Sequence, residues 1–433
     1  MNVQDLLQKD AFLCDCGREH HSDTRILQVG DAAIYDRIPG MLGGIHRVLV
    51  ISDGNTRPLC GEKVIAALAG AGITVDEAFF NQTDVLIPDE ATIAKAEACF
   101  CAGTGAVIGV GSGVINDLSK YIAFNHQVPS MIVATAPSMD GFASSGAVMM
   151  LKGLKVTCSR RAPRWIVADM HVLAGAPIDM IRSGIGDLLG KFSALSDWKL
   201  ATLMSSEPAC QMIYDLVETE TNACIDNIDA IMRRDPAAIG RLMESLAIVG
   251  ITLAYQGSSR PASGSEHLIS HFFELTCVKN HLPYFPHGID VAYSAVVSEM
   301  LRKRLAEEDP ATFAFRFDRS AWHRGLVRCF DDMAPEIEAM QDKNATYATD
   351  RSGFIRDRWP TIRSYLKQTP GVAFMKKILG KAGYNLEDFK AMYGLDKIRD
   401  AVRHASDIKT RYTLLALLSD TGKLETYAKE LTL

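Results

Sequence analysis

The sequence predicts an α/β domain with a parallel, Rossmann-like sheet, followed by an all-helical domain. In the first 175 residues, short apolar runs alternate with helical patterns, as in proteins whose parallel sheets are covered by helices. After Pro177 the strand-like runs cease and a helical period takes over. The chain has 433 residues, which is more than one typical core requires. We therefore expect one domain over residues 1–177 and a second over residues 178–433.

The expected strands are short apolar runs bounded by turn residues. They lie at 24–30, 47–53, 74–80, 106–111, 130–137 and 164–169. Helical patterns lie between them at 61–72 and 91–100, and in the second half at 179–200, 210–234, 237–255, 266–275 and 413–431. Open parallel sheets bind ligands beyond the carboxyl ends of their strands, and a cleft between two domains is the usual place for an active site.

The composition is that of an ordinary globular protein, with 48% hydrophobic and 23% charged residues. A net charge of −6 and the absence of a basic stripe argue against a nucleic-acid partner. The first residues lack the apolar region of a signal peptide, and the longest apolar run, 246–255, is too short to cross a membrane. The ten cysteines are scattered, so we expect reduced thiols and a cytoplasmic location.

One cysteine cluster near the start, CDCGREHH, holds Cys14, Cys16, His20 and His21. Zinc uses such ligands, but structural zinc sites usually separate paired cysteines by two to four residues. No second cysteine pair lies nearby in the sequence. We therefore expect a strand with a turn at Gly17 here rather than a metal site.

A glycine-rich turn follows the fourth expected strand and opens a helix. Gly109, Gly111 and Gly113, with Ser112, would let the backbone approach a pyrophosphate at the helix N-terminus. The spacing is G-x-G-x-G rather than the usual G-x-G-x-x-G of dinucleotide-binding proteins. A nucleotide site and a plain tight turn both remain open from this motif alone.

Two further polar loops follow strands. Asp53, Asn55 and Thr56 end one strand, where a carboxylate can bind ribose hydroxyls or simply form an Asx turn. The loop after another strand contains the polar side chains Thr135, Ser138 and Asp140 among glycines. Taken together, the three loops favour a nucleotide site.

Three histidines and one aspartate suggest a metal centre. His267 and His271 are four residues apart, on one face of an expected helix, and His287 follows in the next loop. Asp187 lies between glycines in an apolar helical pattern, where a cation would offset the cost of burying its carboxylate. The alternative is that the histidines are polar residues of the core.

The motifs GVGSGVINDLSK, TAPSMDGFASSGA, GIGDLLGKFSALSDWKL, SGSEHLISHFFE and PHGIDVAY occur in this order between residues 109 and 293. They resemble the superfamily of iron-dependent alcohol dehydrogenases and dehydroquinate synthases, and within it the sn-glycerol-1-phosphate dehydrogenase branch. The resemblance implies a homodimer that binds NAD or NADP and one divalent metal ion. It covers roughly residues 24–300 and says nothing firm about the CDCGREHH segment.

The resemblance also implies roles for individual residues. Asp187, His267 and His287 would be the metal ligands, and zinc, nickel and iron suit them about equally. The nucleotide would contact Asp53, Asn55, Thr56, Gly111, Ser112, Gly113, Thr135 and Ser138. Asp140 would approach the substrate hydroxyls. His271 would relay a proton, or else only orient a neighbouring group.

The implied reaction is the reversible NAD(P)H-dependent reduction of dihydroxyacetone phosphate to sn-glycerol 1-phosphate. For the phosphate, the sequence offers the helix N-terminus at Ser263 and Ser265, with Lys155 and Arg260 as cations, although either serine could instead be an N-cap. Asp53 would repel the 2′-phosphate of NADP, whereas Asn55 and Thr56 could accept it. The alternatives are a metal-dependent glycerol or polyol dehydrogenase, a dehydroquinate-type synthase, and a catalytically idle nucleotide-binding scaffold.

Overall fold

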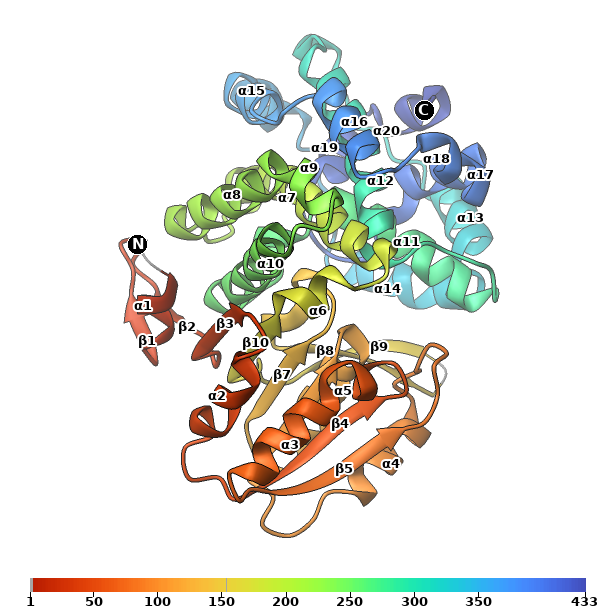
Figure 1. Cartoon of the computed structure of the whole chain (residues 1–433). Helices are drawn as coiled ribbons and strands as arrows, with labels where there is room; N and C mark the ends of the chain where they lie inside the picture. The colour runs from red at the N-terminus through yellow and green to blue at the C-terminus, as the bar shows by residue number, and fades with distance from the viewer. Residues whose placement is uncertain (1–2, 153) are drawn as a thin grey trace. The chain divides into compact units, whose positions relative to one another are not determined.

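The computed structural model describes residues 3–152 and 154–433. The chain divides into two compact units (Figure 1). The first comprises residues 1–185 and 222–258, and the second comprises residues 186–221 and 259–433. The expected boundary at residue 177 marks a change in sequence pattern, and as a domain boundary it stays a prediction.

The first unit is built on a six-stranded sheet in which every neighbouring pair is parallel. Its order is β3-β10-β7-β6-β4-β5. All six expected strands are present: β3 (Ile26–Gly30), β4 (Arg47–Asp53), β5 (Thr74–Phe80), β6 (Ala106–Gly111), β7 (Ser130–Ala134) and β10 (Trp165–Asp169). The chain runs from β4 out to β5 and returns to β6 on the other side of β4. The order therefore reverses between β4 and β6, the place where open sheets of this kind bind ligands.

Helices cover both faces of this sheet (Figure 1). Successive residues of a strand point to opposite faces, so Val48 and Val50 of β4 pack against α2 (Ile34–Met41) and α3 (Glu62–Gly70). Leu49 and Ile51 pack on the other face against α4 (Glu90–Ala98) and α5 (Gly113–Asn125). Because both faces are buried, the strands are continuously apolar rather than alternating.

Two antiparallel hairpins supplement the sheet. At the start of the chain β1 (Ala11–Leu13) pairs with β2 (Glu19–His21), and Gly17 between them has φ +79°. The expected strand with a turn at Gly17 is thus confirmed. The second hairpin, β8 (Gly146–Leu151) with β9 (Leu154–Ser159), follows the loop after β7 and was not expected from the sequence.

The apolar run at 246–255 forms part of α10 (Pro236–Gln256). The whole helix has 21 residues and is long and apolar enough to span a membrane by length and composition alone. Two thirds of its most apolar window, 67%, is nevertheless buried inside the protein, as in the core helix of a soluble protein. Asp235 caps its first turn by accepting from the N–H of Ala238 at 2.9 Å, and Gly257 ends it with φ +72°.

The described residues of the second unit form helices joined by loops, with no strand among them. Buried aromatic rings pack on one another within this unit: Phe273 stacks on Tyr393 at 4.0 Å between ring centroids, and Tyr293 stacks on Phe389 at 4.9 Å. The helices that build the site below are α7 (Ile178–Ser205), α11 (Ser265–Lys279) and α12 (His287–Ala306). The other helices that lie in this unit wholly or for the most part are α8 (Gln211–Asp226), α13 (Arg319–Phe330), α14 (Ala334–Lys343), α15 (Ser352–Lys367), α16 (Val372–Lys381), α17 (Leu386–Tyr393), α18 (Leu395–His404), α19 (Leu414–Asp420) and α20 (Leu424–Glu430).

Candidate metal centre and nucleotide loops

Asp187 lies on α7, fully buried, where two glycines bring neighbouring helices close. A Cβ on Gly186 would stand 2.1 Å from the carbonyl oxygen of Gly288, at the start of α12. A Cβ on Gly190 would stand 2.6 Å from Val291 Cγ1. Only glycine permits these approaches, so the sequence around Asp187 holds its carboxylate against the first turn of α12.

Side chains from three helices converge at this point. Ligand atoms of Asp187, His267 and His287 all lie within 4.8 Å of one another. The Nε2 atom of His267, on α11, is 3.5 Å from Asp187 Oδ1. The ring of His287, the first residue of α12, has its centroid 5.2 Å from that of His267. The three residues proposed as metal ligands are therefore neighbours in space, although 100 residues of sequence separate the first from the last.

Glu266 orients His267. Its Oε1 accepts a hydrogen bond from His267 Nδ1 at 2.7 Å and another from the backbone N–H of Gly264 at 2.8 Å. Metal-bound histidines commonly donate their second ring N–H to a carboxylate in this way, which fixes the tautomer and directs the other nitrogen at the metal. Here the other nitrogen is the one that faces Asp187.

Lys191 was not singled out from the sequence, although it lies one helical turn beyond Asp187. Its Nζ donates to Asp187 Oδ1 at 2.7 Å and to the carbonyl of Ala262 at 3.2 Å, and both side chains of the ion pair are fully buried. This ammonium offsets the cost of burying the carboxylate. The burial of Asp187 alone therefore does not require a metal, and the inference rests on the convergence of three donors.

Metal binding requires ionised carboxylate and neutral imidazole, and the pKa shifts of Asp187 and His287 favour these forms. Burial and the neighbouring His267 lower the pKa of His287 to about 3. Burial alone would raise the pKa of Asp187, but the Lys191 ammonium and the histidines hold it well below its usual range. Burial tends to lower the pKa of His267, but hydrogen bonds to Asp187 and Glu266 outweigh burial and leave this pKa above its usual value.

His271 lies one turn beyond His267 on α11, with its ring stacked on that of His287 at 5.4 Å. Its Nδ1 is 3.3 Å from Glu274 Oε2. His271, Glu274 and His287 form a second set of potential ligands that shares His287 with the first. Burial lowers the pKa of His271 to about 4, so it is neutral at pH 7.

A carboxylate with two imidazoles is a donor set that fits zinc, nickel or iron. The residues present thus fit a resident divalent metal by their chemistry, their spacing and the support of Glu266.

The nucleotide loops meet at the carboxyl edge of the sheet in the first unit. Ser112, after β6, is hydrogen-bonded to Ser138, after β7, with 2.8 Å between their hydroxyl oxygens. The N–H of Thr135 donates to the carbonyl of Gly111 at 3.1 Å. The structure therefore brings together the loop residues that the sequence assigned to nucleotide binding after these two strands.

The loop after β4 is an Asx turn. Asp53 Oδ1 accepts from the backbone N–H groups of Asn55 at 3.0 Å and Thr56 at 2.9 Å, and from the Thr56 hydroxyl at 3.0 Å. Asn55 is tied to the carbonyl of Thr83 at 2.9 Å. This is the plain turn considered from the sequence, and it presents the Asp53 carboxylate at the end of β4, beside the reversal of strand order.

Two of the three glycines of the G-x-G-x-G motif, both within β6, are required by packing. A Cβ on Gly109 would lie 2.4 Å from Ser119 Oγ, and a Cβ on Gly111 would lie 2.6 Å from Ile115 Cβ. Both contacts are with α5, so these glycines let the helix approach the strand. A Cβ on Gly113 would meet only the flexible end of Met139, at 3.3 Å.

We therefore expect Gly111→Ala to destabilise the fold by about 1–3 kcal/mol, because its Cβ overlaps Ile115. Ile115→Ala opens a cavity that costs about 2–5 kcal/mol alone. In the double variant the Cγ1 and Cγ2 atoms of residue 115, at 2.6 and 3.0 Å from the new methyl carbon, are gone and only the Cβ contact is left. The overlap is thus partly relieved, and the sum of the two single losses should exceed the loss in the double variant. Urea unfolding of the four proteins measures this coupling, and strictly additive losses would contradict the packing role.

The residues predicted to contact substrate have varied surroundings. Asp140 begins a 3-10 turn, Asp140–Ala143, whose backbone packs so closely on α10 that a Cβ on Gly250 would lie 2.3 Å from the Asp140 carbonyl oxygen. Lys155 lies on β9, opposite Met150, but its side chain lies outside the described part of the structure. Arg260 forms a buried, two-point ion pair with Glu207, with Nε 2.6 Å from Oε2.

The N-terminus of α11 is satisfied by carboxylates. Asp197 Oδ2 accepts from the Ser265 N–H at 2.7 Å and from the Ser265 hydroxyl, and Glu266 takes the Gly264 N–H. Neither Ser263 nor Ser265 is the N-cap, which is Gly264. The N–H groups of Gly264 and Ser265 are thus already bonded to carboxylates, with which a phosphate at Ser265 would have to compete.

Two cations close to this region escaped sequence analysis because they lie in the segment 405–413, where no motif was recognised. Arg411 donates to the Ser259 hydroxyl at 2.6 Å and to the Ser263 carbonyl at 3.4 Å. Burial and the charge of Arg260 lower the pKa of Arg411. Burial and the charge of Arg411 lower the pKa of Lys409 to about 8. The charge of Lys409 in turn contributes to lowering the pKa of His271. Two half-buried cations that lower each other's pKa are typical of an anion-binding site.

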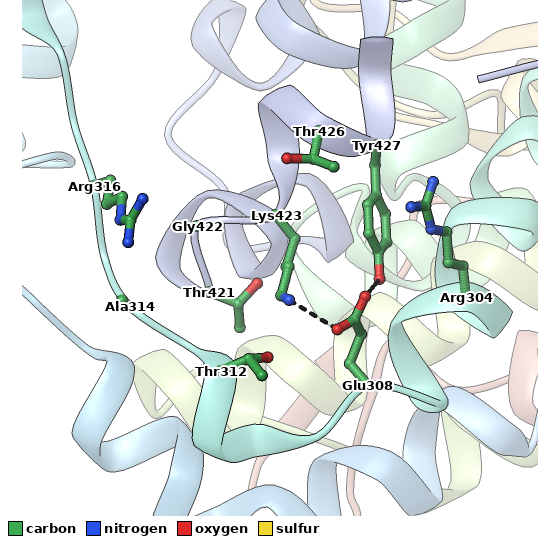
Figure 2. Close-up of a pocket in the computed structure, with 10 residues that line it drawn as sticks. All are labelled: Arg304, Glu308, Thr312, Ala314, Arg316, Thr421, Gly422, Lys423, Thr426 and Tyr427. Carbon is green, nitrogen blue, oxygen red and sulfur yellow. Dashed lines mark hydrogen bonds and ion pairs between the residues drawn. The ribbon is translucent and has the colours of Figure 1, made fainter. Parts of the chain in front are cut away.

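A pocket elsewhere in the second unit shares no residue with the metal centre (Figure 2). In it Glu308 accepts hydrogen bonds from Lys423 and Tyr427, each at 2.7 Å, and Arg304 lies over the Tyr427 ring at 3.9 Å. The polar groups of Glu308, Lys423 and Tyr427 are thus hydrogen-bonded to one another, and nothing in the pocket points to a reaction.

An α/β sheet with nucleotide-type loops, combined with a converging Asp–His–His set on helices, defines a metal-dependent oxidoreductase of the alcohol dehydrogenase class. Residues 36–177 match the family model of iron-containing alcohol dehydrogenases. Among solved structures, the fold is similar to an iron-containing alcohol dehydrogenase from Thermococcus thioreducens, with TM-score 0.62, 13% identity, and coverage of 95% of this chain and 100% of the other. It is also similar to a probable glycerol dehydrogenase from Sinorhizobium meliloti, with TM-score 0.59, 17% identity, and coverage of 93% and 97%.

Relatives in sequence define the family more narrowly than the solved structures do. The chain is 33% identical over 426 residues to the glycerol-1-phosphate dehydrogenase (NAD(P)+) of Bacillus licheniformis, covering 96% of this chain and 94% of the relative. It is 29% identical to the enzyme of the same name from Bacillus subtilis, over 88% and 86% of the two chains. The chain belongs to the iron-containing alcohol dehydrogenase superfamily and, within it, to the family of glycerol-1-phosphate dehydrogenases. The sequence resemblance and the fold expected from it are confirmed.

Proposed function

We propose that this protein catalyses the reversible NAD(P)H-dependent reduction of dihydroxyacetone phosphate to sn-glycerol 1-phosphate, with one divalent metal as a second cofactor. The observation that carries the proposal is the Asp187–His267–His287 set, which occurs in a chain related over almost its whole length to glycerol-1-phosphate dehydrogenases. A catalytically idle scaffold would have no reason to keep three converging donors, two of them buried, and the carboxylate that orients one of them.

Asp187, His267 and His287 would hold the metal, and Glu266 would keep the His267 ring in place through its Nδ1–H hydrogen bond. A bound divalent metal supplies Lewis-acid polarisation of the ketone, and reduced nicotinamide supplies the hydride. Lys191 keeps Asp187 ionised. His271, with its Nδ1 directed at Glu274, is placed to pass a proton between the substrate oxygen and solvent.

For the nucleotide, we propose the loops after β4, β6 and β7. The free N–H groups at the start of α5 favour the pyrophosphate, and the Ser112–Ser138 hydrogen bond holds the two flanking loops together. Asp53, at the end of β4, is placed for the ribose hydroxyls. Its charge favours NAD over NADP, because a 2′-phosphate beside a carboxylate is repelled.

For the substrate phosphate, we propose the cations Arg411 and Lys409 in place of the N–H groups of α11. Arg411 lies against Ser259 and Ser263. The charge of Lys409 lowers the pKa of His271, and the charge of Glu274 in turn raises that of Lys409. A phosphate dianion between these cations would relieve the mutual repulsion that lowers their pKa values. Asp140 remains the proposed contact to the substrate hydroxyls.

The proposal is tested by following nicotinamide absorbance with dihydroxyacetone phosphate and with dihydroxyacetone. We expect kcat/KM to be at least about a hundredfold higher for the phosphate, because two charge-assisted hydrogen bonds of about 1.5–3 kcal/mol each are lost without it. Equal values for the two ketones would instead favour a glycerol or polyol dehydrogenase, the activity named for the structural relative from Sinorhizobium meliloti.

We further propose that the protein is a cytoplasmic homodimer. The cytoplasmic location is supported by the scattered cysteines, which suit a reducing compartment. The homodimer is supported by the resemblance to the family, and sedimentation of the purified protein tests it.

A further inference from the structure

The β1–β2 hairpin gathers three potential metal ligands outside the catalytic centre. The thiols of Cys14 and Cys16 and the imidazole of His20 offer ligand atoms that lie within 4.8 Å of one another. Cys16 Sγ is 3.4 Å from His20 Nε2. The two cysteines come from the turn and the histidine from β2, whose His20 pairs with Phe12 of β1. The hairpin therefore brings together residues that the sequence spacing alone did not indicate as a site.

The tautomer of His20 is fixed by its other nitrogen. Nδ1 is 2.7 Å from the backbone carbonyl oxygen of Tyr255, and because a carbonyl can only accept, Nδ1 carries the hydrogen. In the neutral ring this leaves Nε2 with a lone pair directed at Cys16 Sγ. A ring N–H bonded to a backbone carbonyl is the usual support of a metal-bound histidine. His20 is completely buried, so its orientation is rigid.

The turn that carries the cysteines is tightly closed. The N–H of Gly17 donates to the carbonyl of Cys14 at 2.9 Å, and the N–H of Cys14 donates to the carbonyl of Arg18 at 3.0 Å. Gly17 has φ +79°, a conformation that favours glycine. This closure folds the chain back between the cysteines and β2, so that both thiols and His20 point into one small volume.

The hairpin is fastened to the C-terminal end of α10. Arg18 donates to the backbone carbonyl of Gln256 at 3.1 Å and to its side-chain oxygen at 2.9 Å. His20 binds the adjacent carbonyl of Tyr255, and Phe12 packs edge-on against the Tyr255 ring at 5.3 Å. The last carbonyls of a helix lack partners within the helix, so the hairpin acts as its cap.

We propose that Cys14, Cys16 and His20 bind a structural zinc ion that locks this cap onto α10. Thiolate and imidazole are the ligands that zinc prefers, whereas the carboxylate-containing catalytic set is of a different kind. Binding displaces the thiol protons, and the bound metal stabilises the hairpin because the three ligands come together only when it is folded. The ion at this site takes no part in the reduction, and the inference is independent of the proposed activity.

The test uses cobalt, because thiolate-to-cobalt charge transfer produces a near-ultraviolet band that ligation by carboxylate and imidazole does not. The full-length protein is stripped with a chelator, reloaded with Co²⁺ and compared with three variants. We expect the band in the wild type and in His267→Ala, which disrupts only the catalytic set. We expect it to vanish in Cys14→Ser/Cys16→Ser. The double variant Cys99→Ser/Cys101→Ser, which has the same C-x-C spacing and belongs to no described ligand cluster, should keep the band.

Metal analysis of the zinc-loaded proteins gives a second readout that does not depend on activity. We expect roughly one equivalent fewer in Cys14→Ser/Cys16→Ser than in the wild type, and a lower Tm. Added zinc should raise this Tm less than that of the wild type, because only the Asp187–His267–His287 set remains to bind it. Circular dichroism shows whether each variant is folded. Serine variants of each remaining cysteine identify any fourth protein ligand. A wild-type protein without the thiolate band, or one whose intact mass shows a disulfide within residues 14–16 under reducing conditions, would overturn the proposal.

Discussion

Replacing His267 with alanine should lower kcat/KM by roughly a thousandfold or more. The variant loses one of three ligands, and the metal contributes several kcal/mol to stabilising the charge that develops on the substrate oxygen. Each 1.36 kcal/mol is about a tenfold change in rate, so about 4 kcal/mol accounts for the expected loss. Turnover and bound metal, measured on the same preparation, should fall together.

The matched control is His323→Gln. This histidine also lies in the second unit and is also paired with a glutamate, with Nδ1 2.9 Å from Glu338 Oε2, but its side chain is 51% exposed and it belongs to no ligand cluster. Its activity and metal content should equal those of the wild type. A His267→Ala protein with full metal content and full activity would remove this residue from the ligand set, and His271–Glu274–His287 would then be the set to examine.

The sheet could be predicted strand by strand because its strands are buried on both faces. Such strands are continuous apolar runs that differ clearly from the helices between them, as in β4 and β6, whose residues are almost all buried. The hairpins gave no comparable signal. β1 and β2 have three residues each, too few for a pattern, and their pairing depends on Gly17 and on contacts with α10 more than 230 residues away in sequence.

The residues of the candidate site likewise fall into those that the sequence could predict and those that it could not. Asp187, His267 and His287 could be named because each occurs within a short motif, and their convergence follows from helix packing allowed by Gly186 and Gly190. Arg411 and Lys409 could not be named. They lie on an irregular segment after α18 whose sequence has no motif. Only the tertiary fold places Arg411 against Ser263 and brings the charge of Lys409 near enough to lower the pKa of His271.

The phosphate site predicted at the N-terminus of α11 shows a further limit of prediction from sequence. A serine-rich helix N-terminus favours anions in general, but a sequence does not reveal that the anions are supplied internally. Here Asp197 and Glu266 take the N–H groups, and Asp197 is itself held by Arg302 at 3.1 Å. Only the tertiary fold shows that a buried carboxylate 68 residues away in the sequence is bonded to the Ser265 N–H.

Arg411→Gln should lower kcat/KM for dihydroxyacetone phosphate by about 10- to 150-fold, because a charge-assisted hydrogen bond to the phosphate is worth about 1.5–3 kcal/mol. Glutamine can still donate to the Ser259 hydroxyl, so the local hydrogen bonding that Arg411 provides is partly preserved. The diagnostic quantity is selectivity: kcat/KM for dihydroxyacetone, which lacks the phosphate, should hardly change. Lys409→Met should act in the same direction.

Arg319→Gln serves as the control, because that arginine is 54% exposed and its partners, Glu338 and Asp342, lie outside the site. It should leave both substrates unaffected. If Arg411→Gln lowered kcat/KM equally for the two ketones, the arginine would be a structural tie between its segment and residues 259–263, and the phosphate would have to be bound elsewhere. A loss confined to the phosphorylated ketone has no structural explanation, since a distorted metal centre would reduce both ketones poorly. Selectivity therefore separates recognition of the phosphate from support of the fold.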